Sequence, residues 1–337
     1  MKRVLVTGTA GFIGFYLAKL LLREGIVVHG YDAMTDYYDV ALKQRRHQML
    51  LQSQGFSATE AYLEEENTFL TVAAKFKPDV IVHLAGQAGV RYSLENPRAY
   101  LDSNVVGTFN VLEAAKELAV DHLLMASTSS VYGANEDMPF IETEKADTPL
   151  TFYAATKKAT EAMGHSYAHL WDLPITMFRF FTVYGPWGRP DMAHFKFTKG
   201  ILEGTPIDIY NNGEMYRDFT YVEDLTRAIY LLIGAVPIRP QSKDDIDSGD
   251  SLSPVAPYRI VNIGNSNQVK LLDYIEAIEA AIGQKAVRNY MEIQPGDVPA
   301  TWANAELLQK LTGYQPTTNV REGISKFVAW YRDYYGK

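Results

Sequence analysis

The chain has 337 residues, of which 47% are hydrophobic and 21% are charged, a composition typical of a globular protein with one large domain or two that share a core. Cysteine is missing from the sequence, which excludes disulfides, thiolate metal sites and cysteine nucleophiles, and we expect no bound metal. The formal net charge of −8 argues against a nucleic-acid-binding surface, which needs clustered lysine and arginine side chains.

The N-terminal segment MKRVLVTG has only a short apolar run, which predicts no signal peptide. No later segment approaches the ~18 uncharged apolar residues of a membrane span. We therefore expect a cytoplasmic protein with no membrane partner.

The first half of the chain alternates apolar strand patterns with helical patterns. Strands are predicted at residues 3–8, 27–32, 79–86, 122–127 and 174–185, and helices at residues 14–25 and 103–118. Repeated strand–helix alternation implies right-handed crossovers. We therefore expect an α/β fold with a doubly wound parallel sheet of the Rossmann type and helices on both faces.

After about residue 185 the pattern loosens into shorter elements and loops rich in Gly, Pro and Asn. Helices are predicted at residues 222–236 and 319–336, a strand at 258–264, and an exposed loop at 236–257, which is rich in Asp, Ser and Pro. We expect a Rossmann domain over residues 1–181, to which the chain returns near 219–235 and 258–266. The remainder of residues 182–337 is expected to form a smaller mixed α/β domain that binds the substrate.

The segment VLVTGTAGFIG places Gly8, Gly11 and Gly14 between a predicted strand and the start of a helix. Glycines allow a tight turn and a close approach of the backbone to a pyrophosphate, which sits on the helix N-terminus. The second strand ends at Asp32, where a carboxylate accepts hydrogen bonds from the adenosine ribose hydroxyls. The same carboxylate would repel a 2′-phosphate, so NAD is favoured over NADP; the alternative is an aspartate that only ends a solvated strand.

Tyr153 and Lys157 stand four residues apart in YAATK, a spacing that on its own is also one turn of any helix. The spacing Gly-x-x-Gly-x-x-Gly resembles the extended short-chain dehydrogenase/reductase family, and the resemblance covers essentially the whole chain. The active site of that family pairs Tyr-x-x-x-Lys with a Ser or Thr at an upstream strand end. The resemblance therefore implies that Tyr153, Lys157 and Thr128 of ASTSSVYG are catalytic.

Further matches to the family lie along the expected cofactor. The resemblance implies NAD contacts from Gly8, Gly11, Phe12, Ile13, Gly14, Asp32, Leu84, Ala85, Gly86, Asn104, Tyr153 and Lys157. One position departs from the family pattern, which has an Asp-Leu or Asp-Ile pair against adenine. Tyr62 and Leu63 stand at that place, so either Glu60 or Glu64 substitutes or the adenine is recognised differently.

The expected chemistry is the oxidation of a carbinol. Tyrosine has an ordinary pKa near 10, and we expect the Lys157 ammonium and the positive nicotinamide ring to lower the pKa of Tyr153. Tyr153 then takes a hydroxyl proton, Thr128 bonds the reacting oxygen, and hydride leaves the same carbon for NAD. Ser129 and Ser130 stand where relatives that eliminate water or lose a carboxyl group have acidic residues. The simplest completion is return of the hydride to the opposite face, as in an epimerase.

Five further segments are similar to the UDP-glucuronate 4-epimerases of bacteria and plants within this family: DAMTDYYDVALKQRR, AGQAGVR, RFFTVYGPWGRPDMA, RDFTYVEDL and QPGDVPATWAN. The similarity implies conversion of UDP-glucuronate to UDP-galacturonate through a 4-keto intermediate. UDP-galactose 4-epimerases usually have Asn where this chain has Thr182 and Tyr where it has Phe180. Thr182, Ser129 and Ser130 are therefore expected to hold the substrate carboxylate, although the two serines also suit simple strand-end hydrogen bonding.

The same similarity places basic and aromatic residues around the rest of the UDP-sugar. Arg217 is expected to pair with the diphosphate through its planar fork of donors, Arg189 to reach the diphosphate or the sugar, and Tyr210 to stack on uracil. Arg91 lines the sugar pocket or caps a helix. Asp297 contacts the nucleotide ribose or serves as an N-cap or loop residue.

Two other functions stay open at this point. One is 4-epimerisation of a neutral UDP-hexose, against which Thr182 and the serine pair argue. The other is a non-catalytic NAD-binding regulatory protein, against which the intact Thr–Tyr–Lys set argues. The helices near Asn104 and Tyr153 offer small and apolar positions, and the family resemblance implies a homodimer through them.

Overall fold

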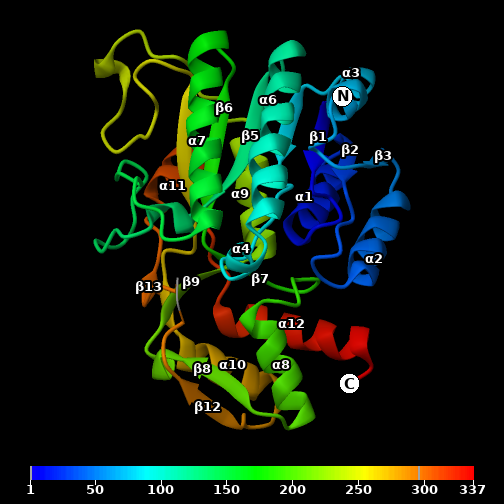
Figure 1. The fold of residues 1–337 in the computed structure, drawn as a ribbon, viewed down its shortest axis with the longest axis vertical. Coiled ribbons are helices and arrows are strands. Elements are labelled where there is room, and N and C mark those ends of the chain that lie inside the picture. Colours follow the sequence, from blue (N-terminus) through cyan, green and yellow to red (C-terminus); the bar gives the residue numbers. More distant parts are fainter. Residues whose placement is uncertain (1, 295–296) are drawn as a thin grey trace.

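The computed structural model describes residues 2–294 and 297–337, and its centre is a seven-stranded sheet (Figure 1). The strands lie in the order β10-β6-β5-β4-β1-β2-β3, and every neighbouring pair runs parallel. Their bounds are β1 (Arg3–Thr7), β2 (Val27–Asp32), β3 (Phe56–Glu60), β4 (Val80–His83), β5 (His122–Thr128), β6 (Ile175–Phe180) and β10 (Tyr258–Ile263). The doubly wound parallel sheet predicted from the sequence is confirmed.

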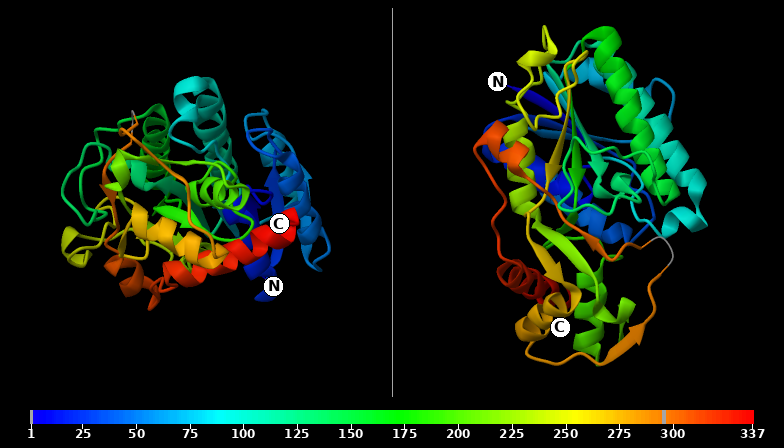
Figure 2. Two further views of the ribbon diagram at one scale, coloured as in Figure 1. Left: turned by 90° about the horizontal axis from the view of Figure 1, so that it is seen from below. Right: turned by 90° about the vertical axis from the view of Figure 1, so that its left-hand side faces the viewer.

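Helices cover both faces of this sheet (Figure 2), because alternate residues along each strand point to opposite sides. Val4 and Val6 of β1 belong to one apolar cluster with residues of α1 (Phe12–Arg23), α9 (Val222–Leu232) and α11 (Glu306–Thr312). Leu5 belongs to the cluster on the other side, with residues of α3 (Thr68–Phe76), α6 (Gly107–Glu117) and α7 (Phe152–Trp171). Burial on both faces explains why the central strands are continuous apolar runs in the sequence.

Several helices follow the carboxyl ends of the strands. α2 (Val40–Leu51) follows β2, and α4 (Tyr92–Glu95) and α5 (Pro97–Tyr100) follow β4. A π-helix, η1 (Leu101–Val106), then runs directly into α6, and the 3₁₀ helix η2 (Ser129–Tyr132) follows β5. In an open parallel sheet, ligands bind at the carboxyl ends where the strand order reverses, which here lies between β1 and β4.

A smaller group of elements lies at one end of the large sheet (Figure 1). It contains a four-stranded sheet of β7 (Thr182–Tyr184), β9 (Tyr216–Tyr221), β11 (Gln268–Lys270) and β13 (Ala300–Thr301), and a strand pair of β8 (Ile207–Tyr210) and β12 (Arg288–Met291). The helices of this group are α8 (Ala193–Glu203), α10 (Leu271–Ile282) and α12 (Val320–Tyr335). Its core is rich in aromatic rings, including Phe219 stacked on Tyr274 with 3.8 Å between ring centroids.

The single strand predicted over residues 174–185 is wrong. β6 ends at Phe180 in the large sheet, and β7 begins at Thr182 beside β9 in the small sheet. Phe181 between them is buried in an apolar cluster with Tyr132 and Phe140, which anchors the chain where it changes sheets. We propose that this change of sheet marks the boundary between the domains expected over residues 1–181 and 182–337.

The other predicted elements of the second half are present with shifted ends. The predicted helices correspond to α9 and α12, and the predicted strand corresponds to β10, which pairs with β6. Residues 236–257 project from the body as a loop, drawn in yellow in Figure 1, with the 3₁₀ helix η4 (Lys243–Asp245) inside it. None of the described helices is long and apolar enough to cross a membrane.

Candidate active site

The glycine turn between β1 and α1 forms one wall of a cavity at the carboxyl ends of the central strands. Gly8 has a φ of +81°, which L side chains rarely adopt, and a Cβ on it would lie 2.9 Å from the Ala85 nitrogen. A Cβ on Gly14 would lie only 2.1 Å from the Gly8 carbonyl oxygen, and one on Gly11 would lie 2.9 Å from the same oxygen. The turn therefore requires all three glycines for its own packing, before any ligand is considered.

Asp32 closes the turn from the end of β2. Its Oδ2 accepts a hydrogen bond from the Ala10 N–H and its Oδ1 accepts one from the Met34 N–H, both at 2.9 Å. Each carboxylate oxygen has two lone pairs, so each keeps one for a further donor. Asp32 therefore shapes the glycine turn and also presents a negative charge to the cavity that it lines.

A buried chain of hydrogen bonds fixes the loop after β4. Thr7 Oγ1 accepts from the N–H groups of Leu84 at 3.1 Å and Ala85 at 3.0 Å, and lies 2.8 Å from His83 Nδ1. The Thr7 hydroxyl therefore donates to Nδ1, which puts the imidazole proton on Nε2, 3.0 Å from Thr108 Oγ1. Burial lowers the pKa of His83 to about 3, so this imidazole is neutral. The loop backbone is thereby held against the glycine turn.

Asn104 lies in the π-helix η1, behind the cavity wall. Its Oδ1 accepts from the Gln87 N–H at 2.8 Å, and its Nδ2 donates to the Gln87 carbonyl at 3.0 Å and to Thr156 Oγ1 at 3.1 Å. Thr156 is the neighbour of Lys157 on α7, so Asn104 joins the loop after β4 to the helix with the predicted catalytic pair. Single π-turns are frequent at functional sites. The structure gives Asn104 a positioning contact and does not place it among the described residues that line the cavity.

Thr128, Tyr153 and Lys157 meet at this cavity. Thr128 is the last residue of β5, and α7 begins just before Tyr153, where Thr151 Oγ1 accepts a capping hydrogen bond from the Ala154 N–H at 3.2 Å. Because Tyr153 and Lys157 are four residues apart, they share one face of the helix. The Thr128 side chain is close enough to act on the pKa of the Tyr153 hydroxyl, which it lowers. The predicted catalytic residues are thus brought together by one strand end and the first turns of one helix.

Burial dominates the acid–base properties of this pair. It raises the pKa of Tyr153, and the Thr128 side chain and the charge of Arg189 oppose it only in part. It also lowers the pKa of Lys157 to about 8, against the negative charge of Glu161. The predicted lowering of the pKa of Tyr153 is wrong for the polypeptide alone, because desolvation of the phenolate outweighs the charges that the chain supplies.

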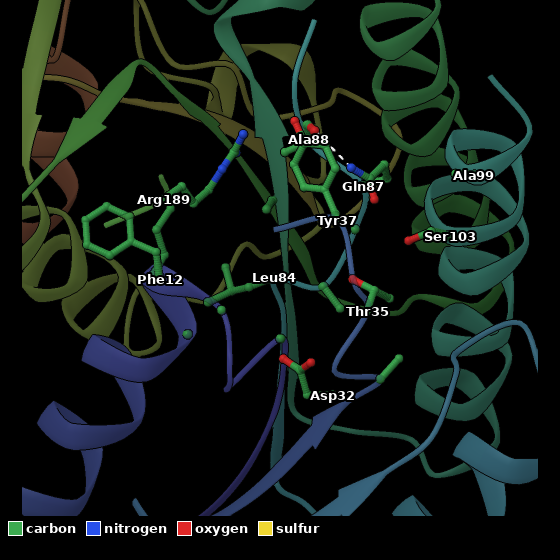
Figure 3. A pocket seen from close by; sticks show the side chains of 18 of the residues that line it. Phe12, Asp32, Thr35, Tyr37, Leu84, Gln87, Ala88, Ala99, Ser103 and Arg189 are labelled. Atoms are coloured by element: carbon green, nitrogen blue, oxygen red, sulfur yellow. Dashed lines mark hydrogen bonds between the residues drawn. The ribbon is translucent and has the colours of Figure 1, made fainter. Parts of the chain in front are cut away.

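The cavity has a volume of about 470 Å³. Figure 3 shows four of the residues around it. Phe12 begins α1, Asp32 ends β2, Leu84 lies in the loop after β4, and Arg189 lies in the segment before α8. The predicted site residues that line it are Gly8, Gly11, Phe12, Ile13, Gly14, Asp32, Leu84, Ala85, Gly86, Thr128, Tyr153, Lys157 and Arg189. The predicted residues outside its lining are Arg91, Asn104, Ser129, Ser130, Thr182, Tyr210, Arg217 and Asp297.

Three of the predicted substrate residues contact one another. Arg91 Nη2 donates to Asp297 Oδ2 at 3.0 Å, and the Arg91 guanidinium lies 4.5 Å from the centroid of the Tyr210 ring. Arg91 is the N-cap residue of α4, as the helix-cap alternative expected, but its side chain makes no capping hydrogen bond there. The Asp297 pair raises the pKa of Arg91 although burial acts in the opposite direction.

Arg217 is a desolvated cation on β9. Its Nη1 donates to the carbonyls of Tyr216 at 2.9 Å and Pro299 at 3.2 Å. Burial lowers its pKa, against the more distant charge of Asp297. Guanidinium has five N–H donors, so Arg217 keeps donors for an anion.

Thr182 and the serine pair follow the carboxyl ends of two neighbouring strands. Thr128 at the end of β5 pairs with Phe180 at the end of β6, and Thr182 is two residues further along the chain. Thr128 Oγ1 accepts from the Ser130 N–H and donates to Ser130 Oγ, both at 3.2 Å. Ser130 therefore takes part in strand-end hydrogen bonding, which the sequence left open as the alternative to a substrate contact.

Arg189 is held in the cavity by a neighbouring carboxylate. Its Nε donates to Asp191 Oδ1 at 3.0 Å, its Nη2 donates to Asp191 Oδ2, and the Tyr37 hydroxyl donates to the same Oδ2 at 3.2 Å. Asp191 raises the pKa of Arg189 although burial acts to lower it. The contact joins the segment after β2 to the segment before α8.

From the sequence, no individual role was assigned to the lining residues that follow β2, which are Ala33, Thr35, Asp36, Tyr37 and Tyr38 before α2 and Lys43 within α2. Lys43 Nζ donates to Thr35 Oγ1 at 2.9 Å and lies 4.5 Å from the centroid of the Tyr38 ring. The buried Arg46 donates to the Tyr38 hydroxyl at 2.6 Å and to the Trp187 carbonyl at 2.8 Å. These residues belong to the segment DAMTDYYDVALKQRR, which resembles the family but does not by itself predict which of its side chains reach the cavity.

The position expected to contact adenine is also part of the cavity. Tyr62, Leu63 and Glu64 line it, whereas Glu60 ends β3 and is not among the described lining residues. The Tyr31 hydroxyl donates to the Tyr62 carbonyl at 3.0 Å, which fixes the backbone there. Of the two acids considered from the sequence, Glu64 is the one placed at the cavity.

A model of the NAD dependent epimerase/dehydratase family matches residues 4–243. The chain belongs to this family. The family expected from the sequence is therefore confirmed. Among relatives in the family, a protein of Rhizobium meliloti (strain 1021) named "Probable UDP-glucuronate 4-epimerase" is 54% identical over 333 residues, which cover 99% of this chain and 98% of that protein. UDP-glucuronate 4-epimerase 1 of Arabidopsis thaliana is 43% identical over 99% of this chain and 77% of its own length.

Solved structures of family members have the same fold. UDP-glucuronic acid 4-epimerase from Bacillus cereus, in complex with UDP-glucuronic acid and NAD, superposes with a TM-score of 0.87 at 30% identity, covering 99% of this chain and 100% of that chain. UDP-glucose 4-epimerase from Thermotoga maritima, with UDP-glucose, gives a TM-score of 0.84 at 25% identity, covering 99% of each chain.

Proposed function

We propose that the protein converts UDP-glucuronate to UDP-galacturonate by NAD-dependent epimerisation at C4. The observation that carries the proposal is the meeting of Thr128, Tyr153 and Lys157 at the cavity that the glycine turn forms. The substrate is supported by the relative from Rhizobium meliloti, 54% identical, and by the Bacillus cereus structure, whose ligands are UDP-glucuronic acid and NAD.

The cavity residues fit NAD. The glycine turn leaves room for backbone approach to a pyrophosphate at the N-terminus of α1, where any larger residue at position 14 would meet the Gly8 carbonyl. Asp32 keeps lone pairs for ribose hydroxyls, and its charge disfavours a 2′-phosphate. We assign the glycine turn, Asp32, the loop after β4, Tyr153 and Lys157 to NAD. When bound, NAD supplies the acceptor of hydride from C4 and its donor in the return step.

Tyr153 is the proposed acceptor and donor of the proton on the C4 oxygen. Thr128, which lines the cavity with Tyr153, would bond the same oxygen of the sugar and so align it with the phenol. Because burial raises the pKa of Tyr153, a phenolate there needs a nearby cation, and Lys157 shares its face of α7. A pKa of about 8 leaves most of Lys157 protonated at neutral pH.

The residues after Thr128 limit the reaction to epimerisation. Ser129 and Ser130 carry no carboxyl group for elimination or for further acid–base steps. The simplest outcome for the 4-keto sugar with the groups at hand is reduction at C4 after its other face is presented. Tyr153 returns the proton to the new C4 oxygen.

The substrate carboxylate needs its own binding site. A 4-keto glucuronate is a β-keto acid, which loses carbon dioxide when the breaking bond aligns with the carbonyl π system. We assign Thr182, Ser129 and Ser130 to hold the carboxylate out of that alignment. Their placement beyond the ends of β5 and β6 supports the assignment.

The nucleotide end is assigned to the other predicted residues. Arg217 suits the diphosphate because it is a half-buried cation with carbonyl partners and further N–H donors, and Arg189 reaches the diphosphate or the sugar. Arg91 covers one face of the Tyr210 ring, so uracil would stack on the opposite face. Asp297 would contact the ribose with the lone pairs that the Arg91 pair leaves.

We also propose a homodimer through the helices near Asn104 and Tyr153. Val106, Phe109 and Phe152 of these helices are exposed by 38%, 46% and 40%, which are large fractions for apolar side chains. An isologous contact would bury them in a four-helix interface. Sedimentation at micromolar concentration is expected to show a dimer, and a monomer there would contradict the assembly.

The function is tested by incubating the purified protein with UDP-glucuronate and resolving the product sugars. We expect a mixture of UDP-glucuronate and UDP-galacturonate, approached from either side. Turnover of UDP-glucose without turnover of UDP-glucuronate would favour the neutral hexose. Bound NAD without turnover of either substrate would favour a regulatory protein.

A further inference from the structure

A buried ion pair lies behind the predicted catalytic residues. Arg179 Nε donates to Glu161 Oε1 and Arg179 Nη2 donates to Glu161 Oε2, both at 2.9 Å. Ser127 Oγ also donates to Glu161 Oε1, at 2.6 Å. The side chains of Arg179 and Glu161 are 1% and 2% exposed. With a further hydrogen bond from Lys158 Nζ at 3.3 Å, the Glu161 carboxylate therefore accepts four hydrogen bonds, two of them in the bidentate geometry typical of strong pairs.

These contacts join the elements that carry the active site. Glu161 lies one helical turn after Lys157 on α7, the helix that also carries Tyr153. Ser127 immediately precedes Thr128 on β5, and it pairs with Arg179 of β6 in the sheet register. One carboxylate thus fixes α7 to two neighbouring strands at the level of Thr128.

Glu161 is also the anion that acts on Lys157. Its negative charge opposes the lowering of the pKa of Lys157 by burial. On β4, His83 faces Lys157 and is neutral, since burial lowers its pKa to about 3. The pKa of Tyr153, on the same helix face, is raised, so this group is neutral as well.

The other groups around Glu161 are cations or neutral hydroxyls. Lys158 Nζ lies 3.3 Å from Glu161 Oε2 on the same helix, and Arg179 faces it from β6. Tyr258 on β10 donates its hydroxyl to the Glu161 carbonyl at 3.0 Å, and burial raises its pKa. A buried ion pair adds little net stability, because the desolvation of both charges offsets their attraction. Stability alone therefore does not explain why this ion pair lies directly behind the predicted catalytic residues.

We propose that Glu161 is a positioning residue for the reaction: its carboxylate fixes Thr128 relative to Tyr153 and Lys157, and it supplies the countercharge of the Lys157 ammonium. The catalytic part of this inference rests on the proposed function. The charge part does not, because the protonation of Lys157 can be measured without substrate.

The first experiment follows Lys157 by NMR titration of the holoprotein labelled with ¹³C at the lysine Cε positions, with Lys157→Arg to assign the signal. Removing an opposite charge disfavours the ammonium, so Lys157 in Glu161→Gln is expected to lose its proton at a pH lower by about one unit. The alkaline limb of kcat against pH is expected to move down with it. KM for UDP-glucuronate is expected to stay within about twofold, because Glu161 touches no residue assigned to the nucleotide.

Glu161→Asp separates position from charge. It keeps the carboxylate but shortens the side chain. The pH at which Lys157 loses its proton is therefore expected to stay at its wild-type value, and kcat is expected to fall by up to about a hundredfold. Wild-type kcat in this variant would contradict the positioning part. If Arg179 without its partner prevents folding of Glu161→Gln, Glu161→Gln/Arg179→Gln removes both charges and is expected to shift Lys157 in the same direction.

Asp250→Asn is the matched control. Asp250 forms another bidentate pair with Arg259, at 2.9 Å and 3.0 Å, with side chains 9% and 11% exposed. This variant is expected to have a lower unfolding temperature. The pH at which Lys157 loses its proton and the dependence of kcat on pH are expected to stay unchanged. If the Glu161 variants behave in the same way, Glu161 is a structural residue and the inference is wrong. If Lys157 shifts as expected in a protein that does not epimerise UDP-glucuronate, the charge part stands and the proposed function fails.

Discussion

The two sides of the proposed site, the glycine turn and the residues assigned to the nucleotide sugar, are built from different kinds of contact. On the side of the glycine turn, the contacts use backbone groups: the Gly11 N–H donates to the Gly8 carbonyl at 3.0 Å, and the Ala10 N–H donates to Asp32 at 2.9 Å. On the side assigned to the nucleotide sugar, long charged side chains meet across the fold. Arg91 and Asp297, which form a pair there, are 206 residues apart in sequence.

This difference bears on how each side receives its ligand. The glycine turn is fixed as soon as β1, β2 and β4 pair, because its contacts follow from the strand positions. On the other side, Arg91 is already bonded to Asp297 and Arg189 to Asp191. An anionic ligand there would have to share or replace these internal partners, so the first side is ready for binding and the second has to rearrange.

The largest expected effect lies where the two sides meet. Tyr153→Phe is expected to lower turnover of UDP-glucuronate by about a hundred- to ten-thousandfold, because the hydroxyl that takes the proton is removed. Lys157→Ala is also expected to abolish turnover of UDP-glucuronate, because it removes the cation beside the phenol. The measurement is product formation, with bound NAD content and unfolding temperature as controls for Tyr153→Phe. Substantial activity in this variant would remove Tyr153 from the mechanism.

The same comparison explains what the sequence could predict. The glycine turn, Asp32 and the catalytic pair are local patterns attached to predicted strands and helices, and all of them line the cavity. β3 was missed because FSATE is half-exposed and lacks an apolar run. The crossing at Phe181 was missed because an uninterrupted apolar run does not show that its two halves join different sheets.

Pairs of distant side chains could not be predicted from the sequence. Arg91 with Asp297, Tyr37 with Asp191 and Glu161 with Arg179 depend on how the elements pack. No local spacing encodes such a pair. The family resemblance implied that Arg91 and Asp297 are site residues, but it did not indicate that they bind each other.

The second prediction concerns the carboxylate of the substrate. Thr182→Val and Ser129→Ala each remove one hydroxyl, and a hydrogen bond to a charged group contributes about 1.5–3 kcal/mol. We expect turnover of UDP-glucuronate to fall by roughly ten- to a hundredfold, more than turnover of UDP-glucose. A carboxylate free to rotate should also lead to release of a decarboxylated UDP-pentose.

Product analysis of both variants with both substrates checks this prediction. UDP-glucose is the control because it has no carboxylate to hold. Equal losses on the two substrates, with no pentose formed, would mean that the hydroxyls only support the strand ends. The assignment of glucuronate would then rest on the relatives alone.

The third prediction tests the side of the glycine turn, which is ready for binding. Asp32→Asn keeps the shape of the side chain but removes its charge and one of the two acceptors that hold Ala10 and Met34. We expect about tenfold weaker binding of NAD and about tenfold less preference for NAD over NADP. Calorimetry with both nucleotides, and analysis of the nucleotide that copurifies with the wild type, give the comparison. Comparable affinity of the wild type for NADP would contradict the role of Asp32.

The smallest expected effect comes from breaking the Arg91–Asp297 pair, on the side assigned to the nucleotide sugar. Arg91→Gln removes the charge opposite Asp297, where the two side chains are 45% and 23% exposed. Because exposed ion pairs contribute only about 0–1 kcal/mol, the free energy of unfolding is expected to change by no more than about 1 kcal/mol. KM for UDP-glucuronate should rise a few-fold, since Arg91 also covers one face of Tyr210, while kcat stays near the wild-type value. Denaturant unfolding and steady-state kinetics measure both quantities, and added salt should weaken the same pair in the wild type. A loss of stability well above this value, or a collapse of kcat, would mean that the Arg91–Asp297 pair is as fixed as the glycine turn, and the contrast between the two sides would not hold.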